Sequence, residues 1–496
     1  MFLGHFTSLI ASPLALSVVA SSLLLSYAVY NRYGRGLNHI PGPFTASCTN
    51  FWRLFLTWRR RPETTHIALH QKYGNVVRLG PNAVSVADPQ AIKTLYGLHA
   101  GFIKSDFYPV QQTIAKGRSL HSLFNTTDEV FHAKLRRAVS NAYAMSTLVQ
   151  FEPLVDSTTV AFLKQLERRY ADRPEHDEAG VCDFGTWLQW YAFDVIGEMT
   201  YSRRLGFVDE GEDVDGIIQS LETLLDYVSV VGQVPILDRL LLKNPLRLWL
   251  SKIGVLGTNS SVVNFARTRI AERDAKKSAF PADAASDLSS GNEPQARDFL
   301  SRFQEAHSKD PVTIPPERVL ALTVANMFAG SDTTAITLRA VFYHLLRNPA
   351  ALQRLMLELE ADDSQLFRAG SVKWSDVRDL PYLGAVIKEA LRCHPAVGLT
   401  LERIVPPAGI TVCDRFIPGG TVVGCSAWVL HRNEQIFGAD ADRFRPERWL
   451  DVPAKQRADM NSFLFSFGAG ARTCIGKNIS LLVSFQGTKA LCRGLR

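Results

Sequence analysis

Ten residues near the end of the chain, Phe467–Gly476, read FGAGARTCIG and place one cysteine inside a glycine-rich loop. Gly468, Gly470 and Gly476 let the backbone turn sharply and approach closely, so main-chain N–H groups can point at the sulfur of Cys474. Such a loop would hold a thiolate against a metal ion. The alternative is that Cys474 is a buried cysteine acting as a small hydrophobic side chain.

Residues next to Cys474 add positive charge to the loop. The apolar segment 475–485 predicts a helix, and the N-terminus of a helix carries partial positive charge that lowers the pKa of a thiol. Arg472 adds a full charge two residues before the cysteine. We therefore expect the pKa of the Cys474 thiol to be lowered.

A second candidate group lies in the sequence AGSDTT, residues 329–334, within a long apolar segment. Thr333 and Asp332 could relay protons from solvent, because a hydroxyl backed by a carboxylate can accept and donate them. Gly330 would cost about 1 kcal/mol relative to alanine inside a helix, which indicates that something approaches the backbone closely there. The alternative is a polar irregularity in which threonine bonds to the preceding carbonyl and bends the helix.

A third candidate group consists of charged residues from two separate segments of the chain. Glu389 and Arg392 in KEALRCHP lie three residues apart, on one face of a predicted helix, and FRPERW places Arg448 further on. A pair with this spacing is most often a surface ion pair.

The elements that must position these groups are mostly helical. Pro315 and Pro316 open the segment around Asp332, and no further proline follows until Pro349, which predicts one long central helix. Residues 75–87 alternate around Gly-Pro-Asn and predict a β-hairpin, and residues 410–427 predict a second one around IPGG. Residues 274–297 read as a solvated loop. The expected fold class is mainly α with a smaller β region.

Composition narrows the function classes. The chain of 496 residues is 46% hydrophobic, enough for a large core, and its seven cysteines lack paired spacing, which argues for a reducing compartment. The net charge of +7 comes partly from the cluster at residues 58–61, which suits a surface resting on anionic lipid. No zinc-finger, RNA-binding or helix-turn-helix signature is present, so we expect no nucleic-acid partner.

The N-terminus predicts a membrane anchor. Residues 6–30 carry no charge and could cross about 30 Å of hydrocarbon as a helix. A cleaved signal peptide is the alternative, but no Lys or Arg precedes the run, whereas Arg32 and Arg35 follow it, which places the rest of the chain in the cytosol. We expect an anchor in residues 1–35, a stiff hinge at HIPGPF, and one catalytic domain in residues 36–496.

The spacing F-x-x-G-x-R-x-C-x-G resembles the heme-binding loop of the cytochrome P450 family. The order of anchor, hinge, AGSDTT helix, Glu-x-x-Arg, arginine segment and cysteine loop covers almost the whole chain and resembles a membrane-bound eukaryotic member, similar to fungal pisatin demethylase-like enzymes. The resemblance implies the P450 fold with heme b between the Asp332 helix and the helix after Cys474. It also implies that Cys474 is the axial ligand of the iron, that Phe467, Gly468, Gly470 and Gly476 shape the loop, and that Glu389, Arg392 and Arg448 form a structural triad.

The same resemblance implies cations for the two heme propionates. Arg472 is the first candidate, because guanidinium pairs with carboxylate in a two-pronged geometry. Arg403 matches a position that often reaches a propionate in relatives. His132 and Arg136 match a place where the family commonly has Trp-x-x-x-Arg, and the histidine departs from that pattern.

The expected function is a monooxygenase that inserts one atom of O2 into a small apolar organic substrate, with Asp332 and Thr333 delivering protons. Electrons would come from NADPH through a membrane-bound reductase docked by Lys134, Arg137 and Lys477, although these three could equally be ordinary solvated charges. The expected location is the endoplasmic reticulum membrane, single-pass, in secondary metabolism or detoxification. Two alternatives are a heme-thiolate isomerase or dehydratase, and a non-catalytic form.

The last residues depart from the expected pattern. Only 22 residues follow Cys474, and VSFQGTKALCRGLR after Leu482 does not resemble the family as IGKNISLL does. A final β-hairpin of the family has no counterpart. We expect an incomplete C-terminus that leaves apolar surface uncovered.

Overall fold

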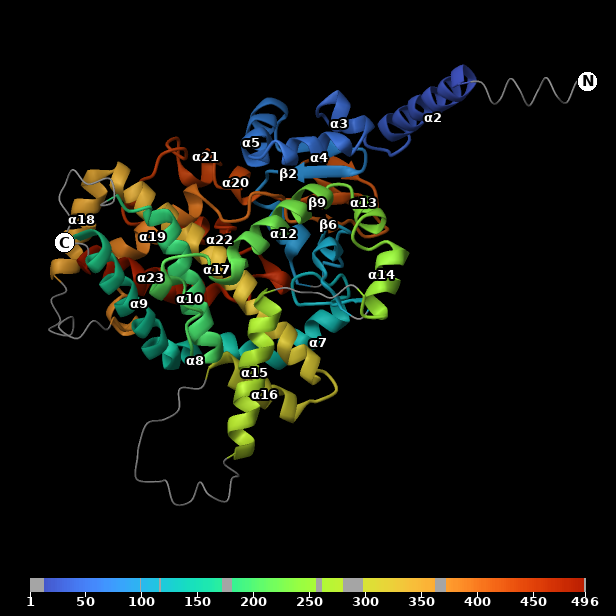
Figure 1. Ribbon diagram of the computed structural model, residues 1–496. Coiled ribbons are helices and arrows are strands. Elements are labelled where there is room, and N and C mark those ends of the chain that lie inside the picture. Colours follow the sequence, from blue (N-terminus) through green and yellow to red (C-terminus); the bar gives the residue numbers. More distant parts are fainter. Residues whose placement is uncertain are drawn as a thin grey trace, which may run out of the picture. The chain divides into compact units, whose positions relative to one another are not determined.

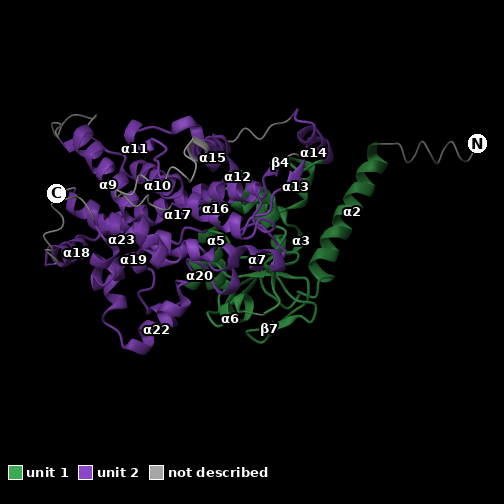
Figure 2. Cartoon of the chain, turned by 90° about the horizontal axis from the view of Figure 1, so that it is seen from below, with its two compact units in different colours: residues 1–111, 227–244, 398–430 green, residues 112–226, 245–397, 431–496 purple. Residues whose placement is uncertain are grey.

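The computed structural model describes residues 13–98, 100–115, 117–171, 181–255, 261–279, 298–361 and 372–494 (Figure 1). The chain forms two compact units, coloured separately in Figure 2. Unit 1 comprises residues 1–111, 227–244 and 398–430, and unit 2 comprises residues 112–226, 245–397 and 431–496. The expected division at residue 35 stays a prediction.

Unit 1 holds most of the β-structure. Its sheet has the strand order β1-β2-β9-β6-β3, formed by Val76–Gly80, Ala83–Val86, Val422–Gly424, Arg403–Ile404 and Ile103–Lys104. Its helices are α2 (Pro13–Tyr33), α3 (Phe44–Cys48), α4 (Phe51–Trp58), α5 (Pro62–Tyr73), α6 (Ala91–Tyr96), η1 (Tyr108–Gln111), α13 (Ile236–Leu240) and α20 (Ala427–Leu430).

The first predicted hairpin is confirmed, because β1 and β2 pair antiparallel with Val76 opposite Val86. The second is shifted. β7 (Ile410–Val412) pairs with β8 (Arg415–Ile417) around a two-residue turn at Cys413 and Asp414, both with positive φ. IPGG instead connects β8 to β9, which runs parallel to β2 in the other sheet. Two residues with positive φ match the twist of a tight hairpin, so the turn forms there and not at the glycines.

Among the described residues, two helices have the length and apolar composition needed to cross a membrane, α2 in unit 1 and α17 (Pro316–Arg347) in unit 2. α17 contributes many residues to the core of unit 2, whereas Asn31 is the single buried residue of α2. Only the C-terminal end of α2 meets the rest of unit 1, where Asn31 donates to the carbonyl of Cys48 at 2.9 Å. Residues 6–12 of the predicted apolar run lie outside the described residues.

Unit 2 is mainly helical. Its helices are α7 (Glu129–Val139), η2 (Ser140–Tyr143), α8 (Met145–Leu148), η3 (Val149–Phe151), α9 (Glu152–Leu166), η4 (Glu167–Ala171), α10 (Phe184–Tyr201), α11 (Phe207–Glu210), η6 (Val214–Gly216), α12 (Ile217–Val231, which continues into unit 1), α14 (Pro245–Lys252), α15 (Ser261–Ala279), α16 (Phe299–Lys309), α17, α18 (Pro349–Ala361), η9 (Trp374–Asp376), α19 (Pro381–Cys393), α21 (Glu434–Phe437), η10 (Pro446–Trp449), α22 (Ala454–Phe463), η11 (Gly470–Arg472) and α23 (Lys477–Gly494). A short hairpin joins β4 (Ile114–Ala115) and β5 (Arg118–Ser119). The predicted loop 274–297 is helical as far as Ala279, and residues 280–297 lie outside the described residues.

α17 is the predicted central helix, and it packs most extensively against α10. A Cβ added to Gly330 would lie 2.9 Å from both Cγ1 and Cδ1 of Ile196 on α10. The backbone at Gly330 is therefore approached by a side chain of α10. The close approach predicted from the sequence is thus a helix-packing contact.

The helix after the cysteine loop continues further than expected. α23 extends to Gly494, and Val483, Leu491 and Cys492 beyond Leu482 are buried in the core. The predicted loss of pattern at Leu482 is wrong for this helix, because its apolar side chains still face the core at helical spacing. The helix also buries the hydroxyls of Ser484 and Thr488, which have no hydrogen-bond partner in the described part of the chain.

Candidate active site

The cysteine loop is closed by backbone hydrogen bonds. The N–H of Cys474 donates to the carbonyl of Phe467 at 2.9 Å, and the hydroxyl of Thr473 donates to the same oxygen at 3.2 Å. Gly468 and Gly470 both have φ of +66°, a conformation that favours glycine. The predicted role of these two glycines in turning the loop is confirmed, whereas Gly476 has no positive φ.

The sulfur of Cys474 receives hydrogen bonds from the backbone N–H groups of Gly476 and Lys477, at the start of α23. The prediction that backbone N–H groups point at the Cys474 sulfur is thus confirmed. The predicted lowering of the thiol pKa is wrong, because burial raises it more than the N–H groups and the charges of Arg136 and Lys477 lower it. A metal ion would deprotonate the thiol in any case.

Positive charge near the sulfur comes from a different arginine than expected. Arg472 forms an ion pair with Glu129 of α7 at 2.7 Å and also donates to the carbonyl of Leu123. Arg136, also on α7, donates to the carbonyl of Thr473 at 2.8 Å and has no carboxylate partner in the described part of the chain. Burial lowers the pKa of Arg136, as expected for a cation with no carboxylate beside it.

The other two predicted propionate residues lie in different surroundings. His132 is buried on α7, one turn before Arg136. Arg403 belongs to unit 1, where it is buried on β6, donates to the carbonyl of Glu402 at 2.8 Å and lies over the ring of Tyr96. Among the described residues, Arg403 has no carboxylate partner, since Glu402 is paired with Arg53.

α17 carries an accessible strip in the middle of a largely buried helix. Ala329 and Thr333, one turn apart, are exposed, whereas Ser331, Thr334 and Ala335 are buried. α17 packs against α23, the helix that begins beside Cys474. Residues with i, i+4 spacing share one face, so this strip is a single surface.

Asp332 and Thr333 point to different partners. The hydroxyl of Thr333 donates to the carbonyl of Ala329 at 2.8 Å, which is the geometry of the alternative interpretation. Asp332 accepts from Gln189 of α10 at 3.3 Å, and Gln189 in turn accepts from Arg339 at 2.9 Å. Burial raises the pKa of Asp332, although the charge of Arg339 opposes it. The structure does not join the Asp332 and Thr333 side chains directly.

Glu389, Arg392 and Arg448 form a buried cluster, so the surface-pair alternative does not hold. Arg392 binds Glu389 with two hydrogen bonds of 2.9 and 2.8 Å, and Nε of Arg448 lies 3.2 Å from the same carboxylate. All three side chains are at most 1% exposed. Burial raises the pKa of Glu389, but the hydrogen bonds and charges of the two arginines outweigh it and hold the pKa below its usual value. Arg448 also pairs with Asp440 at 2.6 Å.

One histidine links this cluster to the cysteine loop. His431 contacts the carbonyl of Arg392 through Nδ1 at 3.0 Å and accepts the backbone N–H of Phe465 at Nε2, 2.8 Å away. Since a backbone N–H can only donate, Nδ1 must carry the proton. The carbonyl of Phe465 accepts from Gly468, inside the loop.

The sequence model of the cytochrome P450 family matches residues 41–491. The chain belongs to the cytochrome P450 family. A "Cytochrome P450 monooxygenase" of Aspergillus terreus is 42% identical over 489 residues, which are 98% of this chain and 93% of that protein. "Cytochrome P450 monooxygenase cicH" of Emericella nidulans is 40% identical over 91% of this chain and 86% of its own length. "Cytochrome P450 monooxygenase mpaDE" of Penicillium brevicompactum is 38% identical over 94% of this chain, which spans 53% of that longer protein.

This cytochrome P450 is accordingly a monooxygenase with a mainly α fold. Its family implies heme, and the residues present fit that group. The Cys474 side chain is accessible although the surrounding protein desolvates it, as expected for a ligand that lines an internal site. Arg136 is a partly buried cation beside this loop without a carboxylate of its own, which suits a propionate.

No motif pointed to His431, Glu129 or Gln189. Each acts on a predicted residue from a distant part of the sequence: His431 on the triad helix, Glu129 on Arg472, Gln189 on Asp332. The only available signal was the acidic first turn of the helix FHAKLRRA, where Glu129 follows Asp128, the N-cap residue.

Proposed function

We propose that this cytochrome P450 is a heme-thiolate monooxygenase of fungal type that oxidises a small apolar organic substrate, with Cys474 as the iron ligand. When bound, heme b supplies the chemistry by which one atom of O2 enters the substrate. The observation that carries the assignment is the Cys474 thiol itself, closed in a loop and met by two backbone N–H groups at the start of α23.

Each cation has a distinct task in this proposal. Arg136 binds a heme propionate, because it has no carboxylate partner among the described residues. Arg472 is neutralised by Glu129 and instead fixes the cysteine loop to α7. His132 supports the same helix face one turn before Arg136. Phe467 closes the loop through its carbonyl, and Gly468 and Gly470 allow the sharp backbone turns through their positive φ. Gly476 contributes its backbone N–H to the sulfur of Cys474.

In this proposal, Asp332 and Thr333 of α17 deliver protons to the reaction. Asp332 is partly buried, and its raised pKa lets it hold and release a proton closer to neutral pH than an ordinary carboxyl can. Thr333 presents its hydroxyl oxygen on the accessible strip, still able to accept a hydrogen bond while it donates to Ala329. A water molecule must bridge Asp332 and Thr333, because their side chains are not in contact. The triad of Glu389, Arg392 and Arg448 is structural.

Electrons come from NADPH through a partner reductase. Lys134 and Arg137 are exposed on α7, and Lys477 is exposed at the start of α23 beside the ring of Phe467. α7 contacts the cysteine loop through Arg136, so the three charges lie on the two helices that adjoin this loop. Changing Lys134, Arg137 and Lys477 to Glu should raise the KM for reductase and leave substrate binding unchanged. The same triple change at Arg168, Lys309 and Lys455 is the control, and equal effects of both would contradict the docking role.

The chain is held at the endoplasmic reticulum membrane by α2, with both units in the cytosol. The support is an exposed apolar helix of 21 residues with Arg32 in its last turn and Arg35 just after it. Deletion of residues 1–30, which keeps Asn31 and Arg32 with their contacts in unit 1, should release the protein from membranes treated with alkaline carbonate and leave heme content unchanged. Persistent carbonate resistance would mean that another part of the chain spans the bilayer. We propose secondary metabolism as the setting because the motifs of the chain resemble those of fungal pisatin demethylase-like enzymes.

The iron-ligand assignment is tested with Cys474→Ser. The serine hydroxyl is a weak iron ligand, so the carbon monoxide difference spectrum of the reduced protein should lose its thiolate band. Cys413→Ser, in the β7–β8 turn, is the matched control and should keep the band. A Cys474→Ser protein with an unchanged spectrum would refute the assignment.

A further inference from the structure

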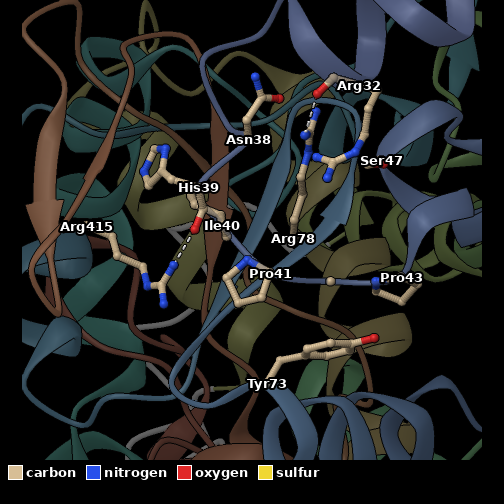
Figure 3. A pocket seen from close by; sticks show the side chains of 11 residues that line it. Arg32, Asn38, His39, Ile40, Pro41, Pro43, Ser47, Tyr73, Arg78 and Arg415 are labelled. Atoms are coloured by element: carbon tan, nitrogen blue, oxygen red, sulfur yellow. Dashed lines mark hydrogen bonds between the residues drawn. The ribbon is translucent and has the colours of Figure 1, made fainter.

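A polar pocket of about 320 Å³ lies in unit 1, at the end of α2 (Figure 3). Three of the side chains that line it are the arginines Arg32, Arg78 and Arg415, and His39 lies beside Arg415. None of the lining side chains in the described part of the chain is acidic. The pocket therefore concentrates positive charge without an internal counter-ion. Its volume is within the range of small-molecule sites, about 300–1,000 Å³.

Arg78 is the buried base of this pocket. Its side chain is only 1% exposed, and its guanidinium donates to backbone carbonyls alone, among them Asn31 at 2.6 Å and Arg32 at 3.0 Å in the last turn of α2. These carbonyls lack intrahelical partners, so Arg78 caps the helix. Carbonyl dipoles do not cancel a full charge, and burial together with the charge of Arg32 lowers the pKa of Arg78 to about 10.

The other two arginines keep unused donors. Nε of Arg32 is buried and has no hydrogen-bond partner in the described part of the chain. Arg415 makes one hydrogen bond, to the carbonyl of His39, which leaves its remaining N–H groups without acceptors among the described residues. In Figure 3, Arg32 and Arg78 lie on one side of the pocket and His39 and Arg415 on the other. An anion between them would receive donors from both sides.

The wall of the pocket is rigid. The N–H of Arg78 donates to the carbonyl of Pro41 at 2.7 Å, and a Cβ on Gly42 would lie 2.3 Å from the carbonyl oxygen of Arg78, so only glycine fits there. Pro41 and Pro43 restrict the same segment. Nε2 of His39 contacts the carbonyl of Phe416 at 2.9 Å, which fixes the ring beside Arg415. The donors are held in place before any ligand arrives.

We propose that this pocket binds the phosphate of an anionic phospholipid headgroup at the point where α2 leaves the bilayer. The proposal rests on the proposed membrane attachment through α2. Guanidinium groups recognise phosphate in a two-pronged geometry, and anionic lipids gather at the cytosolic surface where basic residues follow a spanning helix. The lipid would bring the pocket the negative charge that its lining residues lack.

The test uses the full chain in uncharged detergent, titrated by calorimetry with dihexanoyl phosphatidic acid, dihexanoyl phosphatidylcholine and inorganic phosphate. Phosphatidic acid should bind about tenfold more tightly than either of the other probes. The variant Arg32→Gln/Arg415→Gln should weaken that binding about tenfold, while Arg78 keeps its structural contacts. The control Arg239→Gln/Lys93→Gln removes two exposed charges of unit 1 outside the pocket and should change binding little.

Equal binding of phosphatidic acid by the two double variants would overturn the proposal. Inorganic phosphate that binds as tightly as phosphatidic acid would also overturn it, by identifying a soluble anion as the ligand. Flotation with vesicles of phosphatidylcholine and phosphatidic acid separates this proposal from the membrane attachment. A chain that fails to float yet binds phosphatidic acid in an Arg32- and Arg415-dependent way would refute the attachment and support the phosphate site.

Discussion

The imidazole of His431 accepts the backbone N–H of Phe465 at 2.8 Å, with its other nitrogen 3.0 Å from the carbonyl of Arg392. One neutral, fully buried ring thus connects the Glu389 cluster to the segment that enters the cysteine loop. Ser466 adds a second connection, since its hydroxyl donates to the carbonyl of Leu391 on the helix that carries Glu389, at 2.8 Å. These two contacts link the cluster to the segment that enters the loop.

Replacing His431 with Ala should leave two buried backbone groups without partners. Each such group costs about 1–3 kcal/mol, so the thermal midpoint should fall by several degrees and heme content should fall with it. Differential scanning calorimetry and the ratio of heme to protein absorbance measure both effects. His121→Ala, at an exposed position, should change neither. Normal stability of the His431 variant would mean that the loop is held by other contacts.

Glu389→Gln should destabilise the protein by about 3–5 kcal/mol, because it leaves Arg392 and Arg448 buried without their shared carboxylate. Denaturant unfolding gives the value. The control is Glu305→Gln, which removes the carboxylate of a largely exposed pair with Lys309 and should cost less than about 1 kcal/mol. Similar costs for the two variants would show that the buried cluster contributes little to stability.

Gly330→Ala tests the packing of α17 against α10. The added methyl group would overlap Ile196, so a double-mutant cycle with Ile196→Ala, which removes both Cγ1 and Cδ1, should give a coupling of at least about 0.5 kcal/mol. The gain in helix propensity is the same in both backgrounds and cancels in the cycle. At Gly384 of α19, an added Cβ would have only ordinary contacts with Phe485, so alanine there should stabilise the helix. Zero coupling would show that the contact with Ile196 does not explain the glycine at position 330.

Thr333→Ala should reduce the product formed per NADPH consumed several-fold, because the accessible strip of α17 loses the hydroxyl that positions protons. Thr333→Ser should keep most of the coupling. Thr337 lies one turn after Thr333, and its buried hydroxyl donates to the carbonyl of Thr333. Thr337→Ala removes that hydroxyl and should leave coupling intact. Oxygen and NADPH consumption measured beside product decide between these outcomes. Unchanged coupling in Thr333→Ala would refute the role of its hydroxyl.

Stability should fall in mild acid through His66. Burial, and to a smaller extent the charge of Arg53, lowers the pKa of His66 from 6.5 to about 3. The unfolded chain then binds more protons than the folded one below pH 6.5, so the free energy of unfolding decreases as the pH falls from 6.5 toward 3. At pH 5 the loss for one fully buried histidine is about 2 kcal/mol.

The matched variants are His66→Gln and the exposed His121→Gln. The difference in stability between pH 7 and pH 5 should shrink in His66→Gln and stay unchanged in His121→Gln. Burial also raises the pKa of Asp194 to about 6, which acts in the opposite direction, but Asp194 is present in all three proteins and cancels in the comparison. An unchanged pH difference in His66→Gln would show that His66 titrates normally.

The sequence by itself determined the groups that are local in the chain. The loop Phe467–Gly476, the pair Glu389 and Arg392, the central helix and the first hairpin are each specified by residues within a few positions of one another, through glycine conformation, helical spacing and alternation. These patterns were sufficient to recognise the P450 family.

Only the tertiary structure decided which partner each group meets. Arg472 is neutralised by Glu129 more than 300 positions away, whereas Arg136, also near Cys474, has no carboxylate partner among the residues that the structure describes. Burial raises the pKa of the Cys474 thiol despite the helix N-terminus. Ile196 accounts for Gly330. Desolvation and long-range pairing depend on which elements pack together, and no local spacing encodes that.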